Sequence, residues 1–179
     1  MHSELFIRNA VLKDLEGCAS LDASYETEHV WQMRLGEVEG QLEITFVRVR
    51  LPWPMDVAYP RDSSDLMGDF RRRECFLVAT DRQAVRGFIT LMTIGWNQTA
   101  WIHHLVVDKA WRRRGIGSTL LNRALEWASG QRLRMVTAEA QTKNDPAIQF
   151  YQKHGFTFCG FNDDYYPSGD IALFYARKL

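Results

Sequence analysis

The feature that most constrains this 179-residue chain is a stretch in which an apolar run passes through a basic, glycine-containing turn into a helical pattern. The run Leu105–Val107 is typical of a strand end, and the turn after it carries Gly115 and Gly117. Apolar residues at helical spacing follow, at Ile116, Leu120, Leu121, Ala124, Leu125 and Ala128. The stretch therefore predicts a strand, a glycine turn and a helix in immediate succession.

This arrangement is typical of a turn that binds an anion. Gly115 and Gly117 let the backbone approach a phosphate closely, while the helix amides and the helix dipole point at it. Three arginines, Arg112–Arg114, add positive charge where a diphosphate would sit. The spacing differs from the G-x-G-x-x-G fingerprint and from the P-loop, which needs G-K-[ST]. A tight turn into a packed helix with surface arginines explains the same residues, so the loop alone leaves both interpretations open.

Two motifs together resemble the GNAT superfamily of N-acetyltransferases. Arg112, Gly115 and Gly117 fit the pattern [Q/R]-x-x-G-x-[G/A] of that family's acetyl-CoA pyrophosphate loop, and Asn144–Phe156 is similar to its motif N-x-x-A-x-x-x-Y-x-x-x-G-F. The motifs occur in the family's order at about its usual separation. The resemblance implies an α/β (α+β) GNAT fold: a central mixed, mostly antiparallel sheet with a splayed parallel pair and flanking helices.

Local patterns predict the order of the elements. We expect strands at 5–8, 44–51, 74–80, 85–96, 99–107, 133–140, 156–161 and 171–178, and helices at 12–23, 27–35, 116–129 and 145–154. Thr27 would cap the second helix and Gly36 would end it, while Pro52 and Pro54 would end the strand at 44–51. Residues 57–70 would form a long loop or a short helix. The strands between 74 and 107 would form an antiparallel meander, and 133–140 would run parallel to 99–107 because a helix separates them.

Length and composition, with 46% hydrophobic and 25% charged residues, indicate a single globular domain over residues 1–179. The resemblance implies that this domain is an N-acetyltransferase domain. No apolar run approaches the ~20 residues of a membrane span, and the N-terminus does not have the pattern of a signal peptide. Three cysteines, Cys18, Cys75 and Cys159, are too few and too scattered for a disulfide frame or a zinc site. We expect reduced thiols in or near the core, a cytoplasmic location and no metal.

The charge is balanced overall but unevenly spread. Residues 22–69 carry ten acids and four arginines, whereas residues 109–134 carry seven bases and one acid. A basic half suits a polyphosphate ligand and an acidic half suits a cationic amine, although two solvated faces would look the same. The short arginine cluster, without a recognition helix, argues against a nucleic-acid partner. No membrane partner is expected, and a homodimer is left open.

The resemblance implies acetyl-CoA (coenzyme A) as co-substrate and indicates which residues hold it. The diphosphate would lie against the loop residues Arg112, Arg113, Arg114, Gly115, Ile116, Gly117 and Ser118. The pantetheine arm would bond to the backbone of the strand end at Leu105, Val106 and Val107, which would also help to polarise the thioester carbonyl. Asn144 would contact the cofactor, cap its helix, or do both.

The same resemblance suggests the groups that move protons. Tyr151 matches the family tyrosine that protonates the leaving thiolate, although a core aromatic would show the same spacing. His103 fits the position of a base on the strand before the loop, and the ordinary imidazole pKa of about 6.5 suits that task. Glu139 and a water chain are alternative bases. His104 is adjacent to His103, so on a regular strand the two side chains would point to opposite faces, with His104 packed under a helix or bonded to a neighbour.

We therefore expect an acetyl-CoA-dependent N-acetyltransferase in which a primary amine attacks the thioester directly in a ternary complex. The segment Asn162–Phe174 is similar to the end of streptothricin-type antibiotic acetyltransferases, which favours a small cationic acceptor. Trp53 and Tyr59 lie where such an enzyme would build its acceptor pocket, although surface packing explains either one. The alternatives are an acetyltransferase for protein lysines or N-termini, and a catalytically silent acyl-CoA-binding regulatory module.

Overall fold

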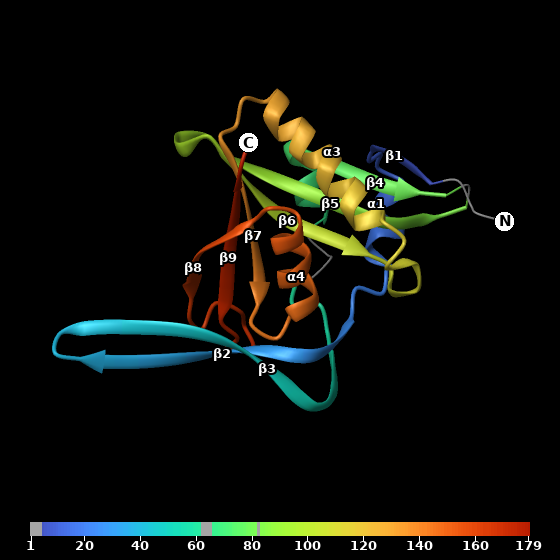
Figure 1. Ribbon diagram of the computed structural model, residues 1–179. Coiled ribbons are helices and arrows are strands. Elements are labelled where there is room, and N and C mark those ends of the chain that lie inside the picture. The colour runs from blue at the N-terminus through green and yellow to red at the C-terminus, as the bar shows by residue number, and fades with distance from the viewer. Residues whose placement is uncertain (1–4, 62–65, 82) are drawn as a thin grey trace. The chain divides into compact units, whose positions relative to one another are not determined.

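A computed structural model of the chain describes residues 5–61, 66–81 and 83–179 (Figure 1). The strands are β1 (Phe6–Asn9), β2 (Tyr25–Val38), β3 (Gln41–Val57), β4 (Phe76–Thr80), β5 (Val85–Ile94), β6 (Thr99–Val107), β7 (Met135–Gln141), β8 (Thr157–Asn162) and β9 (Ala172–Lys178). The α-helices are α1 (Asp14–Ala19), α2 (Leu66–Arg72), α3 (Ile116–Gly130) and α4 (Asp145–Lys153), and two short 3₁₀ turns are η2 (Gly95–Asn97) and η3 (Lys109–Trp111).

The strands form the mixed sheet that the sequence predicts. Hydrogen-bonded neighbours follow the order β1-β4-β5-β6-β7-β9-β8, and β2 pairs with β3 in a separate two-stranded sheet. The meander β4-β5-β6 is antiparallel, and β6 pairs with β7 in parallel, which confirms both expectations. The parallel register runs from Thr99–Met135 only to Trp101–Thr137, although β6 continues to Val107. Such a short ladder is what the expected splay of this pair requires.

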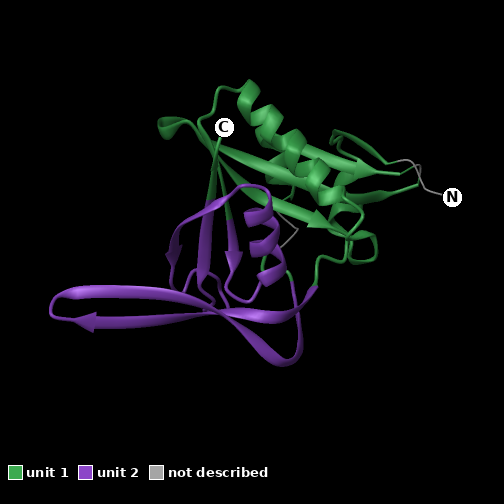
Figure 2. Ribbon diagram, in the orientation of Figure 1, with its two compact units in different colours: residues 1–24, 59–138, 176–179 green, residues 25–58, 139–175 purple. Residues whose placement is uncertain are grey.

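The chain divides into two compact units (Figure 2). The first unit comprises residues 1–24, 59–138 and 176–179, and the second comprises residues 25–58 and 139–175. Helix α1, helix α2, strands β4 to β6 and helix α3 belong to the first unit. The hairpin β2–β3, helix α4 and strand β8 belong to the second.

The core of the first unit lies between its helices and the meander. Helix α3 buries the stripe that its spacing predicts: Ile116, Leu120, Leu121, Ala124, Leu125 and Ala128. A cluster beneath α1 and α2 gathers buried side chains from both helices and from β4 to β6, namely Leu15, Cys18, Leu66, Phe76, Val78, Val85, Phe88 and Val106. This packing fixes the end of β6 against the rest of the unit, and so fixes the position from which the glycine turn starts.

The helix predicted over residues 27–35 is wrong, because this segment is part of strand β2. Trp31, Met33 and Leu35 repeat every second residue and lie opposite Arg48, Phe46 and Ile44 of β3. This cross-strand pairing outweighs the helical reading of the same apolar residues. Gly36 therefore ends no helix. The hairpin turns instead at Glu39 and Gly40, whose φ angles of 49° and 78° are those of a two-residue turn of type I′.

The expectation that Pro52 and Pro54 end the strand is also wrong, since β3 continues to Val57. The register jumps between the pairs Thr27–Met55 and His29–Arg50, so several residues of β3 oppose one residue of β2. Proline has no N–H to donate and is tolerated at such a bulge. The predicted loop or short helix at 57–70 contains the start of α2, while residues 62–65 lie outside the described residues.

Two of the three cysteines are core thiols as predicted. Cys18 and Cys75 are buried, and burial raises the pKa of each thiol to about 12. Cys159 is exposed on β8, so the prediction of a core thiol is wrong there. Its neighbours in sequence are Phe158 and Gly160, and the small and apolar flanks that suggested burial also occur on an edge strand. Within the described residues, the helices are all too short or too polar to cross a membrane.

Candidate functional site

The turn after β6 leads into α3 without placing a side-chain acceptor at the N-terminus of that helix. Asp108 caps η3 by accepting a hydrogen bond from the amide of Ala110 at 3.0 Å. Gly115 then stands at the N-cap of α3 with φ +82°, a conformation that favours glycine, and contributes no side-chain acceptor to the helix amides. The first turn of α3 also contains no acidic residue. Because the first amides of a helix have no partner within it, this end of α3 has the chemistry of an anion cradle.

The three arginines of the turn have different surroundings. Arg112 folds back, and its guanidinium donates to the carbonyl oxygens of Val107 at 3.0 Å and Asp22 at 3.3 Å. Burial lowers the pKa of Arg112. The guanidinium of Arg114 lies 4.7 Å from the ring centroid of Trp111 and donates to the Ala110 carbonyl. Arg113 is exposed with φ +63°. Arg112 and Arg114 thus brace the turn, in addition to the positive charge they supply.

At the end of β6, side chains that are buried in the core alternate with side chains that are only half-buried. Val106 is 4% exposed and belongs to the core cluster, while Leu105 and Val107 on the other face are only half-buried. Any cofactor contact at Val106 is therefore a contact of its backbone. Ile116, also predicted in the loop, is buried in the same way, whereas Gly117 and Ser118 are half-buried.

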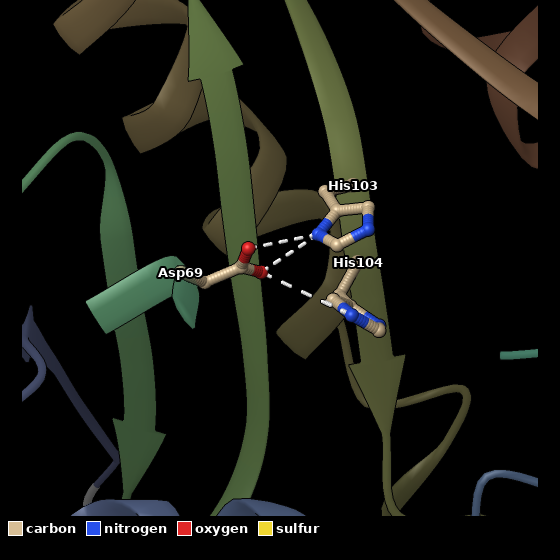
Figure 3. A group of neighbouring side chains, drawn as sticks. All are labelled: Asp69, His103 and His104. Carbon is tan, nitrogen blue, oxygen red and sulfur yellow. Dashed lines mark hydrogen bonds and ion pairs between the residues drawn. The ribbon is translucent and has the colours of Figure 1, made fainter. Parts of the chain in front are cut away.

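His103 and His104 do not point to opposite faces, so that prediction is wrong. On the adjoining strand Thr90 pairs with His104 and Leu91 pairs with Ile102, which leaves His103 as an extra residue in β6. Such a β-bulge breaks the alternation of a regular strand. The two imidazoles meet edge to face, with ring centroids 4.4 Å apart, and Figure 3 shows both directed to one carboxylate, that of Asp69.

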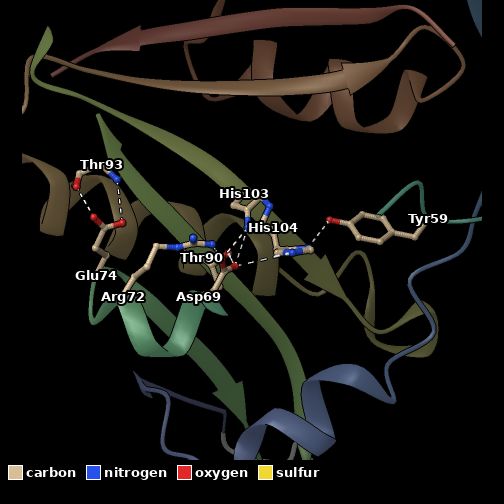
Figure 4. Close-up of polar contacts among 8 residues, drawn as sticks. All are labelled: Tyr59, Asp69, Arg72, Glu74, Thr90, Thr93, His103 and His104. Carbon is tan, nitrogen blue, oxygen red and sulfur yellow. Dashed lines mark hydrogen bonds and ion pairs between the residues drawn. The ribbon is translucent and has the colours of Figure 1, made fainter. Parts of the chain in front are cut away.

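Asp69 of helix α2 is the residue that sequence reasoning missed. Its carboxylate lies 2.9 Å from Nδ1 of His103, accepts a hydrogen bond from Thr90 Oγ1 at 2.7 Å and forms an ion pair with Arg72 at 2.6 Å (Figure 4). The side chain is nearly inaccessible, at 3% exposure. In the sequence Asp69 is one acid among ten in its region, 34 residues before His103, and we find no local signal that distinguishes it.

His104 and Tyr59 form the buried side of this cluster. The Tyr59 hydroxyl lies 3.1 Å from Nδ1 of His104, and the imidazole is 2% exposed. Nε2 of His104 lies 3.9 Å from Asp69. Burial lowers the pKa of His104 to about 4, and the neighbouring His103 contributes in the same direction. His104 bonds to a neighbour, as predicted, and Tyr59 packs into the first unit, whereas Trp53 is 76% exposed on β3.

Asp69, His103 and His104 are also of the residue types that bind metal ions. Asp69, His103 and His104 offer one ligand atom each within 4.8 Å of one another, the one such group found among the described residues. The carboxylate of Asp69 is already taken up by three donors, and one of them is a guanidinium. A cation would have to sit beside that positive charge. Asp69 is thus held in place by hydrogen bonds and an ion pair from within the first unit.

The second unit holds the other motif. Asn144 caps α4, accepting a hydrogen bond from the amide of Ala147 at 3.1 Å, which confirms the capping role. Tyr151, on α4, is buried and packs against Phe150 and Phe156, with ring centroids 5.6 and 5.4 Å away. The described contacts thus show Tyr151 as part of an aromatic core; its predicted role as an acid stays a prediction.

Glu139, the alternative base, accepts hydrogen bonds from two tyrosines of the C-terminal segment. The hydroxyls of Tyr165 and Tyr166 lie 2.8 and 3.2 Å from its two carboxylate oxygens. The segment that resembles the antibiotic acetyltransferases therefore closes over Glu139 within the second unit. A carboxylate whose two oxygens already accept phenol hydrogen bonds is less available to take a proton from an amine.

Comparison with known proteins identifies the family to which these elements belong. The sequence profile of the Acetyltransferase (GNAT) family matches residues 44–156. The streptothricin acetyltransferase of Streptomyces lavendulae is 26% identical over 176 residues, covering 93% of this chain and 91% of that protein. The streptothricin acetyltransferase of Escherichia coli is 36% identical over 88 residues, and the match spans about half of its length (49%). The crystal structure of a nourseothricin acetyltransferase superposes with a TM-score of 0.82 at 26% identity, over 97% of this chain and 98% of that one.

Family, fold and local geometry thus agree. The profile includes β6, the glycine turn, α3 and α4, which are the elements that carry both sequence motifs. The chain therefore belongs to the acetyltransferase (GNAT) family, the acyl-CoA-dependent N-acetyltransferases, and within it resembles the streptothricin acetyltransferases.

Proposed function

We propose that this chain moves an acetyl group from acetyl-CoA to a primary amine on a small cationic molecule of the streptothricin type. The observation that carries the proposal is the start of α3, where Gly115 at φ +82° forms an N-cap without a side chain and the first turn contains no acidic residue. Likeness to streptothricin acetyltransferases along nearly the whole chain supports the acceptor class. With two buried thiols, Cys18 and Cys75, we assign the protein to a reducing cytoplasm.

In this proposal the chain holds the co-substrate through its backbone. The amides of residues 115–118 would take the diphosphate, and Arg113 and Arg114 would add positive charge. The backbone of Leu105 and Val107, in the part of β6 beyond its parallel ladder with β7, would bond to the pantetheine. Acetyl-CoA supplies the activated acyl group when bound, and the residues of the chain orient it and move the protons.

His103 is the group we assign as base. Its side chain is 15% exposed, and its Nδ1 is held by Asp69 at 2.9 Å. Glu139 is the weaker candidate because both of its oxygens accept phenol hydrogen bonds. We assign Tyr151 as the acid that protonates the leaving thiolate, on motif position. Replacing Tyr151 with Phe should then lower kcat about 100-fold and leave acetyl-CoA binding unchanged.

The test is free-thiol release from acetyl-CoA with a panel of amines: streptothricin, polyamines and lysine peptides. We expect turnover with streptothricin. Turnover with peptides alone would make the chain a protein acetyltransferase, and acetyl-CoA binding without turnover of any amine would make it a silent acyl-CoA-binding module.

The cradle itself is tested by a matched pair of substitutions. A Cβ at Gly115 or at Gly40 meets no atom within 4 Å, and the two residues share a positive φ, at 82° and 78°. Gly115→Asp places a carboxylate at the cradle and should weaken acetyl-CoA binding about tenfold or more by calorimetry, a loss of about 1.4 kcal/mol. Gly40→Asp, in the hairpin turn, should leave binding unchanged. Absence of any heat with the wild-type chain would end the proposal.

A further inference from the structure

The cluster around Asp69 contains more order than a base alone requires. Asp69 is buried, yet it carries three donors from three different elements: Arg72 on α2, Thr90 on β5 and His103 on β6 (Figure 4). Burial alone would raise the pKa of Asp69, but hydrogen bonds from His103, Arg72 and Thr90 outweigh it and lower the pKa far below its usual range. Asp69 is therefore an anion at neutral pH, and an anionic carboxylate only accepts hydrogen bonds.

That single fact fixes where the hydrogen lies on His103. Both oxygens of Asp69 lie 2.9 Å from Nδ1 of His103, so Nδ1 must be the donor. The neutral ring then carries its lone pair on Nε2, the nitrogen farther from Asp69. Nε2 is the atom able to accept a proton, and the Asp69 carboxylate stabilises the imidazolium that results.

The bulge in β6 makes this contact available. His103 is the extra residue between the pairs Thr90–His104 and Leu91–Ile102, so its ring reaches the side of the sheet on which α2 lies. Thr90 directly faces the bulge and holds Asp69 from β5 at 2.7 Å. Arg72, one helical turn after Asp69, fixes the same carboxylate from α2. The carboxylate is thus located from both sides before it meets the imidazole.

His104 completes the arrangement as a neutral ring. Its Nδ1 lies 3.1 Å from the Tyr59 hydroxyl and its Nε2 faces Asp69 at 3.9 Å. Placing the hydrogen on Nε2 directs its positive end to the anion, and lets Nδ1 accept the hydrogen bond from Tyr59. The buried Nε2, which has no hydrogen-bond partner, then contributes favourably to the field at Asp69. A neutral His104 also keeps a second positive charge away from His103.

We infer that Asp69 is the positioning residue of the transfer reaction: it holds His103 in the Nδ1–H form, so that Nε2 faces outward as the proton acceptor. Asp69 acts through His103 and touches no substrate itself. The inference rests on the proposed function for its catalytic meaning, while the tautomer it assigns is a property of the free protein.

The first measurement is the tautomer itself. The ¹⁵N NMR signals of His103 are assigned in protein with ¹⁵N-labelled histidine as the set that disappears in His103→Gln. In the wild-type protein these signals should show a protonated Nδ1 and an unprotonated Nε2. The opposite tautomer overturns the inference, whether or not the chain is an active transferase. If no amine is acetylated while Nδ1 is protonated, the proposed function falls and the positioning of the ring stands.

The second measurement is kinetic. Asp69→Asn replaces one of the two acceptor oxygens with an NH₂ donor and removes the negative charge, so the Nδ1–H tautomer is no longer enforced. We expect kcat to fall about 10²–10⁴-fold while the Kd for acetyl-CoA stays the same. Asp69→Glu should recover part of the rate. The control is Glu74→Gln: this carboxylate bonds to Thr93 in the same unit, with the Thr93 amide at 2.9 Å, and should keep the wild-type rate. An Asp69→Asn protein that folds and keeps its kcat overturns the inference.

A third measurement separates the hydrogen-bonded pair from a metal site. Zn²⁺ added to the wild-type chain at one equivalent should leave the His103 and His104 resonances in place. A stoichiometric shift of both rings, lost in Asp69→Asn, would show that the cluster is a metal site and would overturn the inference.

Discussion

Two buried aspartates, one in each unit, use the same device for different ends. Asp145, at the start of α4, accepts two hydrogen bonds of 2.8 Å from Arg48 and one of 3.0 Å from the Trp31 indole. Asp69 likewise pairs with one arginine, Arg72, and with neutral donors. Burial works to raise the pKa of each carboxyl, but its donors outweigh that effect and hold the pKa below the usual value.

The difference lies in the donors. Every partner of Asp145 is protonated at all ordinary pH values, so the contact can only tie the hairpin β2–β3 to α4 within the second unit. One partner of Asp69 is an imidazole that can lose or gain a proton at its far nitrogen. The two carboxylates therefore differ in their donors more than in their burial, and this difference is the basis on which we propose a role in the reaction for Asp69 and a structural role for Asp145.

The largest expected effect tests this distinction directly. His103→Gln should lower kcat/KM about 10²–10⁴-fold, with little change in thermal midpoint, because Arg72 and Thr90 still hold Asp69. Asp145→Asn should do the reverse, lowering stability and sparing the rate per folded molecule. Initial rates and thermal melts of both variants check the pair. Equal losses of activity would mean that the two carboxylates do not differ in kind.

Acid should affect the two clusters over different pH ranges. His104 has a folded-state pKa of about 4, below the ordinary 6.5, so the unfolded chain binds the proton first on acidification. Stability should therefore fall as the pH drops from about 6.5 to 4, by about 2–3 kcal/mol from this group. Asp69, His103 and Arg61 are the charged or titratable groups that act on it electrostatically.

Urea unfolding at pH 7, 6, 5 and 4 measures this dependence. His104→Gln should flatten the slope above pH 4. The depressed pKa of Asp145 acts in the other range: its stabilisation is complete above the unfolded value near 3.9 and is lost below it, so Asp145→Asn should leave the slope above pH 4 intact. An unchanged slope in His104→Gln would mean that the imidazole is not kept neutral.

Removing a guanidinium from the second cluster should give a moderate effect. Arg48→Met leaves Asp145 buried at 9% exposure without its main partner, but Arg48 itself is 40% exposed, so solvent screens part of the loss. We expect about 1–2 kcal/mol less unfolding free energy at pH 7. The control is Arg50→Met on the same strand, whose pair with Glu28 is longer, at 3.8 Å, and exposed. That change should stay within about 0.5 kcal/mol, and equal losses in the two variants would contradict the assignment.

The smallest effect concerns the indole. Trp31→Phe removes the 3.0 Å hydrogen bond to Asp145 and keeps an aromatic ring on β2, so we expect a loss of about 1 kcal/mol or less by urea unfolding. No change in kcat/KM should accompany it. A loss of activity larger than the loss of folded protein would place Asp145 in the chemistry after all.

What the sequence predicts well is local. The stripe on α3, the meander and the turn at Gly115 follow from periodicity and from the needs of a positive φ, and all of them are found. The hairpin was misassigned because Trp31, Met33 and Leu35 fit a helical face in isolation and acquire their period of two only against β3. The turn Glu39-Gly40, between two alternating stretches, was the signal available for it.

The cluster at Asp69 lay beyond sequence reasoning for another reason. Its contacts join residues 21 and 34 positions apart, and no periodicity reports them. The sequence likewise gives no signal for the bulge that turns His103, because a bulge depends on how two strands align and not on either strand alone. Adjacent histidines on a regular strand separate, and only the pairing pattern reveals that these two converge.

The bulge also has a consequence for how such a site can be changed. In an unbroken ladder, neighbouring positions are kept apart by the thickness of the sheet, so no choice of side chain can bring them to one place. The one extra residue in β6 removes that restriction, so that two adjacent histidines can both face the carboxylate of Asp69. The convergence of His103 and His104 on Asp69 thus depends on the number of residues in β6. Deleting one other residue of this strand would restore regular pairing and separate the two rings, although every functional group remained in the chain.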